Sequence, residues 1–270
     1  MTATDHQFDG SIPAIYARDL VPLIFQPYAD DVADRVAALA PGRVLEVAAG
    51  TGVVTRALDA RLPPSTSLVA SDLNAPMLAH AQAQPIGRRV TWRQADAMAL
   101  PFDDGSFDAV ACQFGAMFFP DKERAFAEAR RVLAAGGHFV FNVWDRVETN
   151  PFPHAVEVEI ARLFPADPPD FLTRVPHGYH DIARIRADLA SAGFTAPARI
   201  DTLTFTLRAT ARQLAIAFCQ GTPLRNEIEV RNGPTLEAVT DAVALGLEER
   251  FGPDLLEGPI QAHVVEAEAR

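Results

Sequence analysis

The chain has 270 residues, of which 49% are hydrophobic and 22% charged, and its formal net charge is −11. This length and apolar content suffice for a large core, so the sequence is typical of an α/β domain with an insertion. The strong negative charge repels phosphate backbones and anionic membranes, so nucleic acid is not expected as a partner or a substrate.

The number of cysteines and the length of the apolar runs indicate the cellular compartment to expect. The two cysteines, Cys112 and Cys219, make neither a disulfide framework nor a zinc site, and Cys112 lies in an apolar run typical of a buried thiol. The first residues lack a basic region followed by an apolar one, and no apolar run reaches the about 20 residues of a membrane span. We therefore expect a cytoplasmic protein without a signal peptide or a membrane span.

In the first half of the chain, short apolar runs alternate with helical patterns. Helical periodicity is clear at residues 30–40, after an N-terminal segment that we expect to be irregular. The pattern predicts strands at 43–47, 67–71, 89–92, 108–112 and 138–143, and helices at 53–60, 75–84 and from a cap at Asp121 to Gly136–Gly137. This alternation predicts a parallel sheet with helices on both faces.

The second half of the chain has a different pattern. A proline-rich stretch over residues 149–177 contains a helix at 155–163, and Asp181 is placed to cap a helix that ends near Gly193. Further elements are expected as a strand at 202–207, helices at 211–219 and 236–250, and a last strand near 262–267. We interpret the extra helices as a cover over one edge of the sheet and not as a separately folding domain.

A glycine turn joins the first predicted strand to the first predicted helix, in the sequence V-L-E-V-A-A-G-T-G at residues 44–52. Its small residues allow a tight turn and a close backbone approach to a ligand, and the helix N-terminus that follows attracts polar or anionic groups. Asp72 ends the second strand 20 residues after Gly52, where an acid can accept both hydroxyls of a nucleoside ribose. For the glycines alone, an ordinary strand-to-helix turn is the alternative.

The glycine spacing separates two classes of nucleoside-binding protein. A dinucleotide fingerprint has the pattern G-x-G-x-x-G/A, whereas Gly50 and Gly52 are followed by the branched Thr55 at the third position. Glu46, four residues before the first glycine, has no part in that fingerprint, and it could pair with a cationic ligand group or order the turn. A nicotinamide-dependent oxidoreductase is therefore a disfavoured alternative.

These residues resemble the first motif of class I S-adenosylmethionine (SAM)-dependent methyltransferases, and the resemblance continues in chain order over about residues 40–145. The segment Q-A-D-A at 94–97 closes the third strand, where that family places an acid against the adenine amine. The segments LPFDDGSFD at 100–108 and RVLAAGG at 131–137 are similar to the ubiquinone/menaquinone C-methyltransferase-like branch, methyltransferase type 11.

The resemblance implies a fold and a domain organisation. The fold class is α/β, with a Rossmann-like, seven-stranded, mostly parallel sheet, helices on both faces and a helical cover. We expect one methyltransferase domain over residues 1–270, with a SAM-binding core at about 40–145 and an acceptor or cover region at about 1–39 and 146–260.

The resemblance also implies the residues that bind SAM, which lie at the ends of strands one to four: Glu46, Ala48, Ala49, Gly50, Thr51, Gly52, Asp72, Leu73, Met77, Asp96, Ala97, Gln113 and Phe114. The turn would lie under the methionine part of SAM, and Asp72 would hold the ribose. Leu73 or Met77 would pack on the adenine, and Asp96 with Ala97 would bind its edge. Gln113 and Phe114 would face the methionine tail and the sulfonium. A turn carboxylate is the alternative for Asp96, as is a core position for Met77.

Methyl transfer requires little covalent help from the protein. The sulfonium is already an activated leaving group, so the protein must align the acceptor and exclude water, and a base helps only with some acceptors. The candidate catalytic residues are His177, Tyr179 and His180, in the region where this fold usually shapes its acceptor site. The alternative is that Asp181 only caps the next helix and the histidines are surface groups. A metal site in this segment lacks further ligands and is not expected.

Aromatic and apolar residues flank the expected cofactor site. An N-terminal group could close over the cofactor or pack on the sheet edge: Tyr16, Phe25 and Tyr28. A second group could form walls beside the sulfonium or belong to the core: Phe114, Met117, Phe118 and Phe119. Together they suggest an apolar or aromatic acceptor.

We therefore expect a SAM-dependent methyltransferase that acts on a small-molecule acceptor and releases S-adenosylhomocysteine. The accepting atom, whether oxygen, carbon or nitrogen, stays open. A non-catalytic SAM-binding protein is the alternative from another class, and chemistry other than methylation stays open on this fold. The oligomeric state is also open, with a homodimer among the alternatives.

Overall fold

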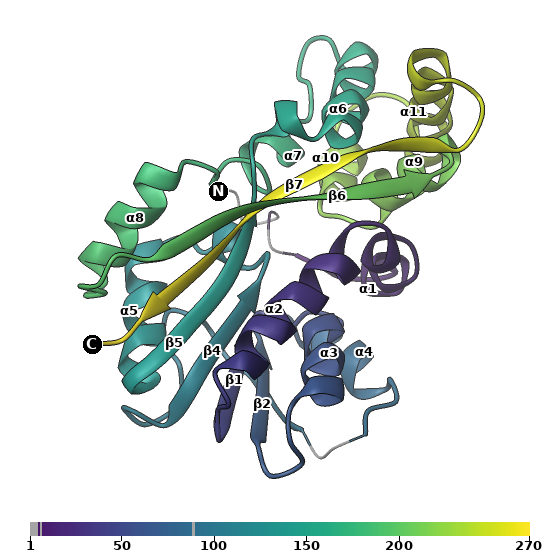
Figure 1. Cartoon of the computed structure of the whole chain (residues 1–270). Helices are drawn as coiled ribbons and strands as arrows, with labels where there is room; N and C mark the ends of the chain where they lie inside the picture. The colour runs from purple at the N-terminus through teal and green to yellow at the C-terminus, as the bar shows by residue number, and fades with distance from the viewer. Residues whose placement is uncertain (1–4, 6, 88–89) are drawn as a thin grey trace. The chain divides into compact units, whose positions relative to one another are not determined.

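The computed structural model describes residue 5, residues 7–87 and residues 90–270, and within them seven strands form one sheet. The spatial order is β3-β2-β1-β4-β5-β7-β6 (Figure 1). In chain order the strands are β1 (Arg43–Val47), β2 (Ser67–Asp72), β3 (Thr91–Gln94), β4 (Phe107–Gln113), β5 (Leu133–Trp144), β6 (Arg199–Ala209) and β7 (Leu256–Glu268). The predicted seven-stranded Rossmann-like sheet is confirmed.

The chain divides into two compact units, which we name by their main content. The sheet unit comprises Gln26–Val143, His180–Leu203 and Ala262–Arg270. The helical unit comprises Met1–Phe25, Trp144–Tyr179 and Thr204–Gln261. Strands β6 and β7 therefore contribute residues to both units.

The sheet is mixed, with a parallel part and an antiparallel part. β1 pairs in parallel with β2 and β4, β2 pairs with β3, and β4 pairs with β5. β7 runs against β5, because Gly136 donates its N–H to the Ala269 carbonyl whereas Asp145 donates to the Gln261 carbonyl. The predicted strand at 89–92 is found at Thr91–Gln94, and Arg89 lies outside the described residues.

The helices of the sheet unit are α2 (Gln26–Ala38), α3 (Val53–Arg61), α4 (Ala75–Gln82), α5 (Lys122–Val132) and α8 (Ile182–Ser191), with the short 3-10 helix η2 (Ala116–Phe118). The chain steps from β1 to β2 in one direction along the sheet and from β4 to β5 in the other. Because parallel crossovers are right-handed in nearly all proteins, these steps place α3 and α5 on opposite faces (Figure 1). The strand order reverses between β1 and β4, where open α/β sheets bind their ligands.

The helix that begins at the Asp121 cap ends earlier than predicted. Its cap is confirmed, but α5 ends at Val132 and β5 begins at Leu133, so the prediction of a helix reaching Gly136–Gly137 was wrong. The two glycines lie inside β5 and exchange hydrogen bonds with Ala269. A Cβ on Gly137 would lie 3.0 Å from the Asp108 carbonyl oxygen, so Gly137 permits a close strand contact, and neither glycine ends a helix.

The helical unit begins with α1 (Ile12–Ile15) and the π-helix η1 (Tyr16–Phe25), and α2 starts at the next residue. The expectation of an irregular N-terminal segment was therefore wrong for residues 12–29. Pro22 lies inside η1, and a proline cannot donate a backbone hydrogen bond and clashes with the preceding turn of an α-helix. The wider π turn accommodates this misfit, which sequence periodicity at the α-helical spacing does not detect.

The remaining elements of the helical unit are η3 (Val147–Thr149), α6 (Pro151–Leu163), α7 (Phe171–Arg174), α9 (Ala211–Gln220), α10 (Leu224–Glu229) and α11 (Leu236–Phe251). α11 packs against α9 and α6. No helix in the described ranges combines the length and the apolar character needed to cross a membrane.

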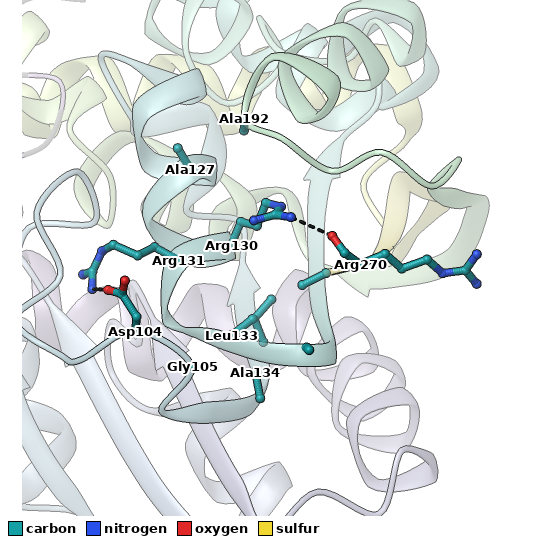
Figure 2. A pocket seen from close by; sticks show the side chains of 11 residues that line it. Asp104, Gly105, Ala127, Arg130, Arg131, Leu133, Ala134, Ala192 and Arg270 are labelled. Atoms are coloured by element: carbon teal, nitrogen blue, oxygen red, sulfur yellow. Dashed lines mark hydrogen bonds and ion pairs between the residues drawn. The ribbon is translucent and has the colours of Figure 1, made fainter.

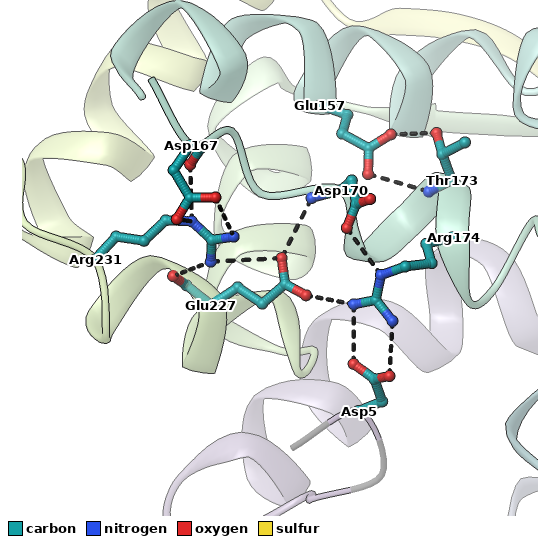
Figure 3. Close-up of polar contacts among 8 residues, drawn as sticks. All are labelled: Asp5, Glu157, Asp167, Asp170, Thr173, Arg174, Glu227 and Arg231. Carbon is teal, nitrogen blue, oxygen red and sulfur yellow. Dashed lines mark hydrogen bonds and ion pairs between the residues drawn. The ribbon is translucent and has the colours of Figure 1, made fainter. Parts of the chain in front are cut away.

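An ion-pair network joins distant segments of the helical unit (Figure 3). Arg174 of α7 donates to both carboxylate oxygens of Asp5, at 2.7 and 3.0 Å, and to Glu227 of α10 at 2.5 Å. Asp170 binds the same guanidinium at 2.8 Å. Because Asp5 is only 1% exposed, its charge depends on this guanidinium for compensation.

Candidate active site

The turn after β1 brings its backbone to the carboxyl end of the sheet, next to the N-terminus of α3. Three residues of this turn have positive φ, namely Ala48 (55°), Gly50 (55°) and Gly52 (79°). A Cβ on Gly52 would lie 3.1 Å from the Ala81 Cβ, so glycine there also permits close packing on α4. The turn thus has the tight geometry that the sequence predicted.

Asp72, the last residue of β2, holds this turn in place. One of its carboxylate oxygens, Oδ2, accepts the Gly50 N–H at 2.8 Å. The other, Oδ1, accepts the Asn74 N–H at 2.7 Å and makes a longer contact of 3.4 Å with the Asn74 amide. The side chain is 7% exposed, and burial raises the pKa of Asp72 above its ordinary value. The carboxylate is therefore a fixed acceptor at the end of β2.

Glu46 is buried in β1 and connects that strand to α3. Its Oε2 atom accepts the Thr55 hydroxyl at 2.5 Å. Burial raises the pKa of Glu46 to about 8, and the Asp72 charge adds to this shift whereas Arg56 opposes it. The hydroxyl of Thr55 explains why a branched residue occupies the third position of the glycine pattern. Of the two roles considered for Glu46, the contact observed is the one that orders the turn.

The residues predicted to contact adenine fall into an exposed and a buried group. Leu73 follows Asp72 and is 47% exposed, which is unusual for a leucine beside a buried acid. Gln94 of β3 donates to the Leu73 carbonyl at 2.8 Å and fixes its backbone. Met77 is buried, and its Cε would lie 3.6 Å from a Cβ on Gly50, so its side chain lies against the glycine turn.

The loop after β3 and the centre of the glycine turn hold the other predicted cofactor residues of this edge. Asp96 accepts the Met98 N–H at 2.8 Å, which is the turn-forming contact considered as its alternative, and Ala97 is buried. Ala49 and Thr51 are also buried, and the Thr51 hydroxyl has no hydrogen-bond partner among the described residues. A buried hydroxyl without a partner costs free energy, so this position of the turn lacks one hydrogen bond.

The carboxyl end of β4 lies beside that of β1 and has a strained backbone. Phe114 has a φ of 48°, and the next residue, Gly115, has no room for a side chain because a Cβ would lie 2.5 Å from the Ala48 Cβ. Tyr28 of α2 packs its ring edge-on against the Phe114 ring at 5.3 Å. Strained positions at two neighbouring strand ends are typical of functional sites.

Asn142 of β5 is a site residue that the sequence analysis did not single out. It is fully buried, and its Oδ1 atom accepts the Phe114 N–H at 2.8 Å. Its Nδ2 atom lies 3.4 Å from the Gln113 side-chain oxygen. A lone amide within the apolar run at residues 138–143 is the signal that could have identified it.

The three acceptor candidates do not belong to one unit. His177 and Tyr179 are buried in the helical unit, whereas His180 is a half-buried residue of the sheet unit. The Nδ1 atom of His177 lies 2.7 Å from the Asp145 carbonyl oxygen, which can only accept, so Nδ1 carries the proton. The alternative of surface histidines was therefore wrong for His177, although Asp181 does cap α8 as expected.

The aromatic groups are distributed over both units. In the helical unit, Tyr16 stacks on Phe25 at 4.9 Å, and Phe25 contacts Trp144 at 5.9 Å. In the sheet unit, Tyr28 and Met117 are buried, whereas the two phenylalanines at 118 and 119 are half-buried. Phe25, Tyr28 and Met117 are therefore buried within their own units.

A hollow of about 400 Å³ in the sheet unit lies at the amino end of β5, away from the strand ends described above (Figure 2). Arg131 in its wall donates to Glu128, to Asp104 and to two backbone carbonyls, and it thereby fixes the loop before β4. Arg130 donates to the Arg270 carbonyl oxygen at 2.6 Å. The arginine side chains of this hollow therefore hold neighbouring segments of the sheet unit together.

Comparison with known families assigns the central part of the chain. Residues 45–141 match the model of a family described as a methyltransferase domain. The chain carries a methyltransferase domain. The match spans β1 to β5 and includes the glycine turn, Asp72 and the end of β4, so the family predicted from these segments is confirmed.

A curated relative matches about half of the chain. The chain is 41% identical over 128 residues to a demethylmenaquinone methyltransferase of Thermus thermophilus, a match that covers 47% of this chain and 58% of that protein. The chain spans about half the length of the curated relatives it matches. Each of these three matches leaves about half of this chain uncovered.

Solved structures share the fold of the methyltransferase domain at low sequence identity. The YcgJ protein of Bacillus subtilis superposes with a TM-score of 0.57 at 16% identity, covering 89% of this chain and 98% of that one. A Haemonchus contortus N-methyltransferase in complex with S-adenosylhomocysteine superposes with a TM-score of 0.58 at 15% identity, covering 99% of this chain and 61% of that one. Together with the family match, these likenesses indicate SAM as the cofactor.

Proposed function

We propose that the methyltransferase domain binds SAM at the carboxyl ends of β1, β2, β3 and β4 and transfers its methyl group to a small-molecule acceptor. The observation that carries this proposal is the joint fixation of the glycine turn and Asp72 by the 2.8 Å hydrogen bond from the Gly50 N–H. It places a backbone cradle and a carboxylate acceptor on neighbouring strands, which is the pair of groups that a nucleoside with a charged tail requires.

The residues present fit this cofactor by their chemistry. Asp72 is a fixed acceptor for the ribose hydroxyls, and its long 3.4 Å contact with the Asn74 amide is the weakest of its bonds and can give way to them. The exposed Leu73 offers an apolar face to the adenine ring. The two glycines of the turn allow the backbone to approach the methionine part closely.

The remaining predicted contacts complete the assignment. Asp96 and Ala97 lie after β3, at the position proposed for the adenine edge. Gln113 and Phe114 lie at the end of β4, at the position proposed for the methionine tail and the sulfonium. Bound SAM supplies an activated methyl group, so these residues need only hold the reactants in line and exclude water.

For the acceptor, we propose a small molecule with an apolar or aromatic ring. This rests on the name of the Thermus thermophilus relative and on the apolar residues around the end of β4. His177 is the candidate base of the helical unit, because the Asp145 carbonyl fixes its tautomer with the proton on Nδ1. An acceptor with an acidic carbon or hydroxyl would benefit from such a base.

Two measurements test the proposal in sequence. Calorimetry should detect binding of S-adenosylhomocysteine and none of NADH, and the opposite result would assign the chain to the oxidoreductase class. Incubation with SAM carrying a labelled methyl group and a demethylmenaquinone-type ring should then move the label into the organic phase. Binding without label transfer to any of a panel of ring, amine and hydroxyl acceptors would instead indicate a non-catalytic SAM-binding protein.

The role of His177 has its own test. The His177→Ala variant should lower kcat by about 100-fold if it acts as a base, with little change in the affinity for SAM. His154→Ala, at a half-buried position of α6 in the same unit, serves as the matched control. Equal turnover of the His177→Ala variant and the unmodified protein would reject the role.

A further inference from the structure

We propose that the hollow at the amino end of β5 binds a small anion of the phosphate class, with the Arg130 guanidinium as its main contact. The hollow is lined by residues of α5, the loop before β4, the first part of β5, the segment after α8 and the segment after β7 (Figure 2). All of them belong to the sheet unit. This inference does not depend on the proposed function, because it concerns the opposite end of the parallel strands.

The hollow combines free volume with an excess of positive charge. Its volume of about 400 Å³ lies within the range of about 300–1,000 Å³ that is typical of ligand pockets. Most of its lining residues have short side chains that leave this space open: Gly105, Ala127, Ala134, Ala135, Ala192 and Ala269. The charged residues of the lining are three arginines and one aspartate: Arg130, Arg131, Arg270 and Asp104.

Two of the three arginines have their charges balanced by acids. Arg131 pairs with Asp104 and with Glu128, each at 2.7 Å. Arg270 pairs with Glu268 at 2.8 Å. The excess of positive charge in the hollow therefore comes from the third arginine.

Arg130 has no acidic side chain paired with it. Within the described ranges its guanidinium makes no ion pair with an aspartate or a glutamate, and its one hydrogen bond runs from Nη2 to the Arg270 carbonyl oxygen at 2.6 Å. The end of α5 supplies a partial negative charge of about one half, and Arg130 and Arg131 share it because both lie in the last turn. A net positive charge therefore remains at Arg130.

The guanidinium of Arg130 also has donors without an acceptor. Its Nε atom is buried and has no partner among the described residues, and a Cβ on Gly193 would lie 3.3 Å from it, so Gly193 covers this atom. The Nη1 atom likewise has no partner in the described part of the chain, but it is not closed off from solvent, and Arg130 lines the hollow. Nη1 is therefore the donor that a ligand in the hollow can reach.

The ligand chemistry follows from these donors and from the charge. The Nη1 and Nη2 atoms of one guanidinium present two parallel N–H groups, which match two oxygens of an oxyanion. Nη2 keeps one N–H for this purpose, because its bond to Arg270 uses the other. An unbalanced positive charge attracts a dianion more strongly than a monoanion, so a phosphate group suits the hollow better than a carboxylate.

The experiment is an NMR titration of ¹⁵N-labelled protein with inorganic phosphate at constant ionic strength. The backbone amide signals of Gly105, Ala134 and Ala135, which line the hollow, should shift and saturate. We expect a Kd of about 1 mM, because a single guanidinium supplies most of the contact. Acetate, a monoanion, should bind at least about 10-fold more weakly.

Two variants on α5 separate a specific contact from a general effect of charge. Arg130→Met should weaken phosphate binding by at least about 10-fold, the value of a hydrogen bond to a charged group. Arg124→Met is the matched control, because it removes the same charge from the same helix, and Arg124 donates to the Met98 carbonyl at 2.9 Å outside the hollow. It should leave the Kd unchanged. Arg130→Lys serves if Arg130→Met does not fold; it keeps the charge but lacks the two parallel donors, and it should weaken binding about threefold.

Each part of the inference has a result that would overturn it. Signals that shift without saturation, or that shift only on other surfaces, would show that the hollow is not a binding site. Equal affinities of the Arg130 variants and the unmodified protein, or equal weakening by Arg130→Met and Arg124→Met, would remove Arg130 as the specific contact. Acetate that binds as tightly as phosphate would contradict the assignment to the phosphate class.

Discussion

The glycine turn of the sheet unit and the ion-pair network of the helical unit are both built from buried carboxylates, but they hold them differently. In the turn, Asp72 is compensated by backbone N–H groups of neighbouring loops, and Glu46 by a hydroxyl nine residues along the chain. In the network, Asp5 is compensated by a guanidinium 169 residues away. In our proposal, the first arrangement leaves the Asp72 carboxylate available to a ligand. In the second arrangement, the carboxylates pair with guanidinium groups and hold distant segments together.

The largest expected effect is a loss of stability when the ion-pair network of the helical unit is broken. Arg174→Met removes the guanidinium that binds both carboxylate oxygens of the buried Asp5, and it leaves Glu227 with only the longer pair of 3.7 Å to Arg231. It should lower the free energy of unfolding by about 3–5 kcal/mol. Urea denaturation measures this loss. Arg208→Met is the matched control, because its pair with Glu257 is exposed on both sides and should contribute less than about 1 kcal/mol. Equal losses in the two variants would mean that burial does not distinguish the network.

The next effect concerns the role of Asp72 in ligand affinity. Asp72→Asn keeps the size of the side chain but removes its charge and one acceptor, and it should weaken binding of S-adenosylhomocysteine by about 30-fold, or about 2 kcal/mol. Asp108 is the matched control, since it also accepts two backbone N–H groups, from Gly42 and Arg43, but at the amino end of β4. Asp108→Asn should leave the affinity unchanged, and a comparable loss there would contradict a specific role for Asp72.

A smaller effect is the pH dependence of stability that the buried Glu46 should cause. The pKa of Glu46 is about 8 in the folded protein, against an ordinary value of 4.5, so the folded chain holds a proton that the unfolded chain has released. The contribution of Glu46 to stability should therefore fall as the pH rises from about 4.5 to about 8, with a slope of about 1.4 kcal/mol per pH unit. Glu46→Gln should flatten this slope. Parallel stability curves for the variant and the unmodified protein would show that Glu46 is ionised in both states.

The smallest expected effect lies in the backbone of the turn. Ala48 has a φ of 55°, which costs alanine about 1 kcal/mol relative to glycine, so Ala48→Gly should raise the free energy of unfolding by about that amount. Ala127→Gly, at an exposed position inside α5, is the opposite control and should lower it by about 1 kcal/mol. A loss of stability in both variants would show that the turn is not strained at Ala48.

The same contrast explains what the sequence could predict. The order of strands and helices from β1 to β5, the glycine turn and Asp72 follow from local patterns, because each contact there joins neighbouring elements. The cap at Asp121 was predicted for the same reason. The end of α5 was not, since Gly136 and Gly137 are fixed by pairing with Ala269, a partner that no local pattern reveals.

The missed features share long-range causes. Asn142 depends on the register between β4 and β5, and the π-helix at Tyr16–Phe25 depends on how Pro22 is accommodated. Two partners of Arg174, Asp5 and Glu227, come from distant segments, so their part of the network has no sequence signature. Residues whose contacts join consecutive strand–turn–helix units, such as Asp72, were predicted, and residues whose partners come from distant segments were not.

The central claim is that the fixed carboxylate of Asp72 receives the ribose of SAM beside the glycine turn. A crystal structure of the protein with bound S-adenosylhomocysteine tests it most directly. We expect the Asp72 carboxylate within hydrogen-bonding distance of the ribose hydroxyls, with Leu73 against the adenine ring. A ligand bound elsewhere, or an Asp72 side chain turned away from the sugar, would contradict the account.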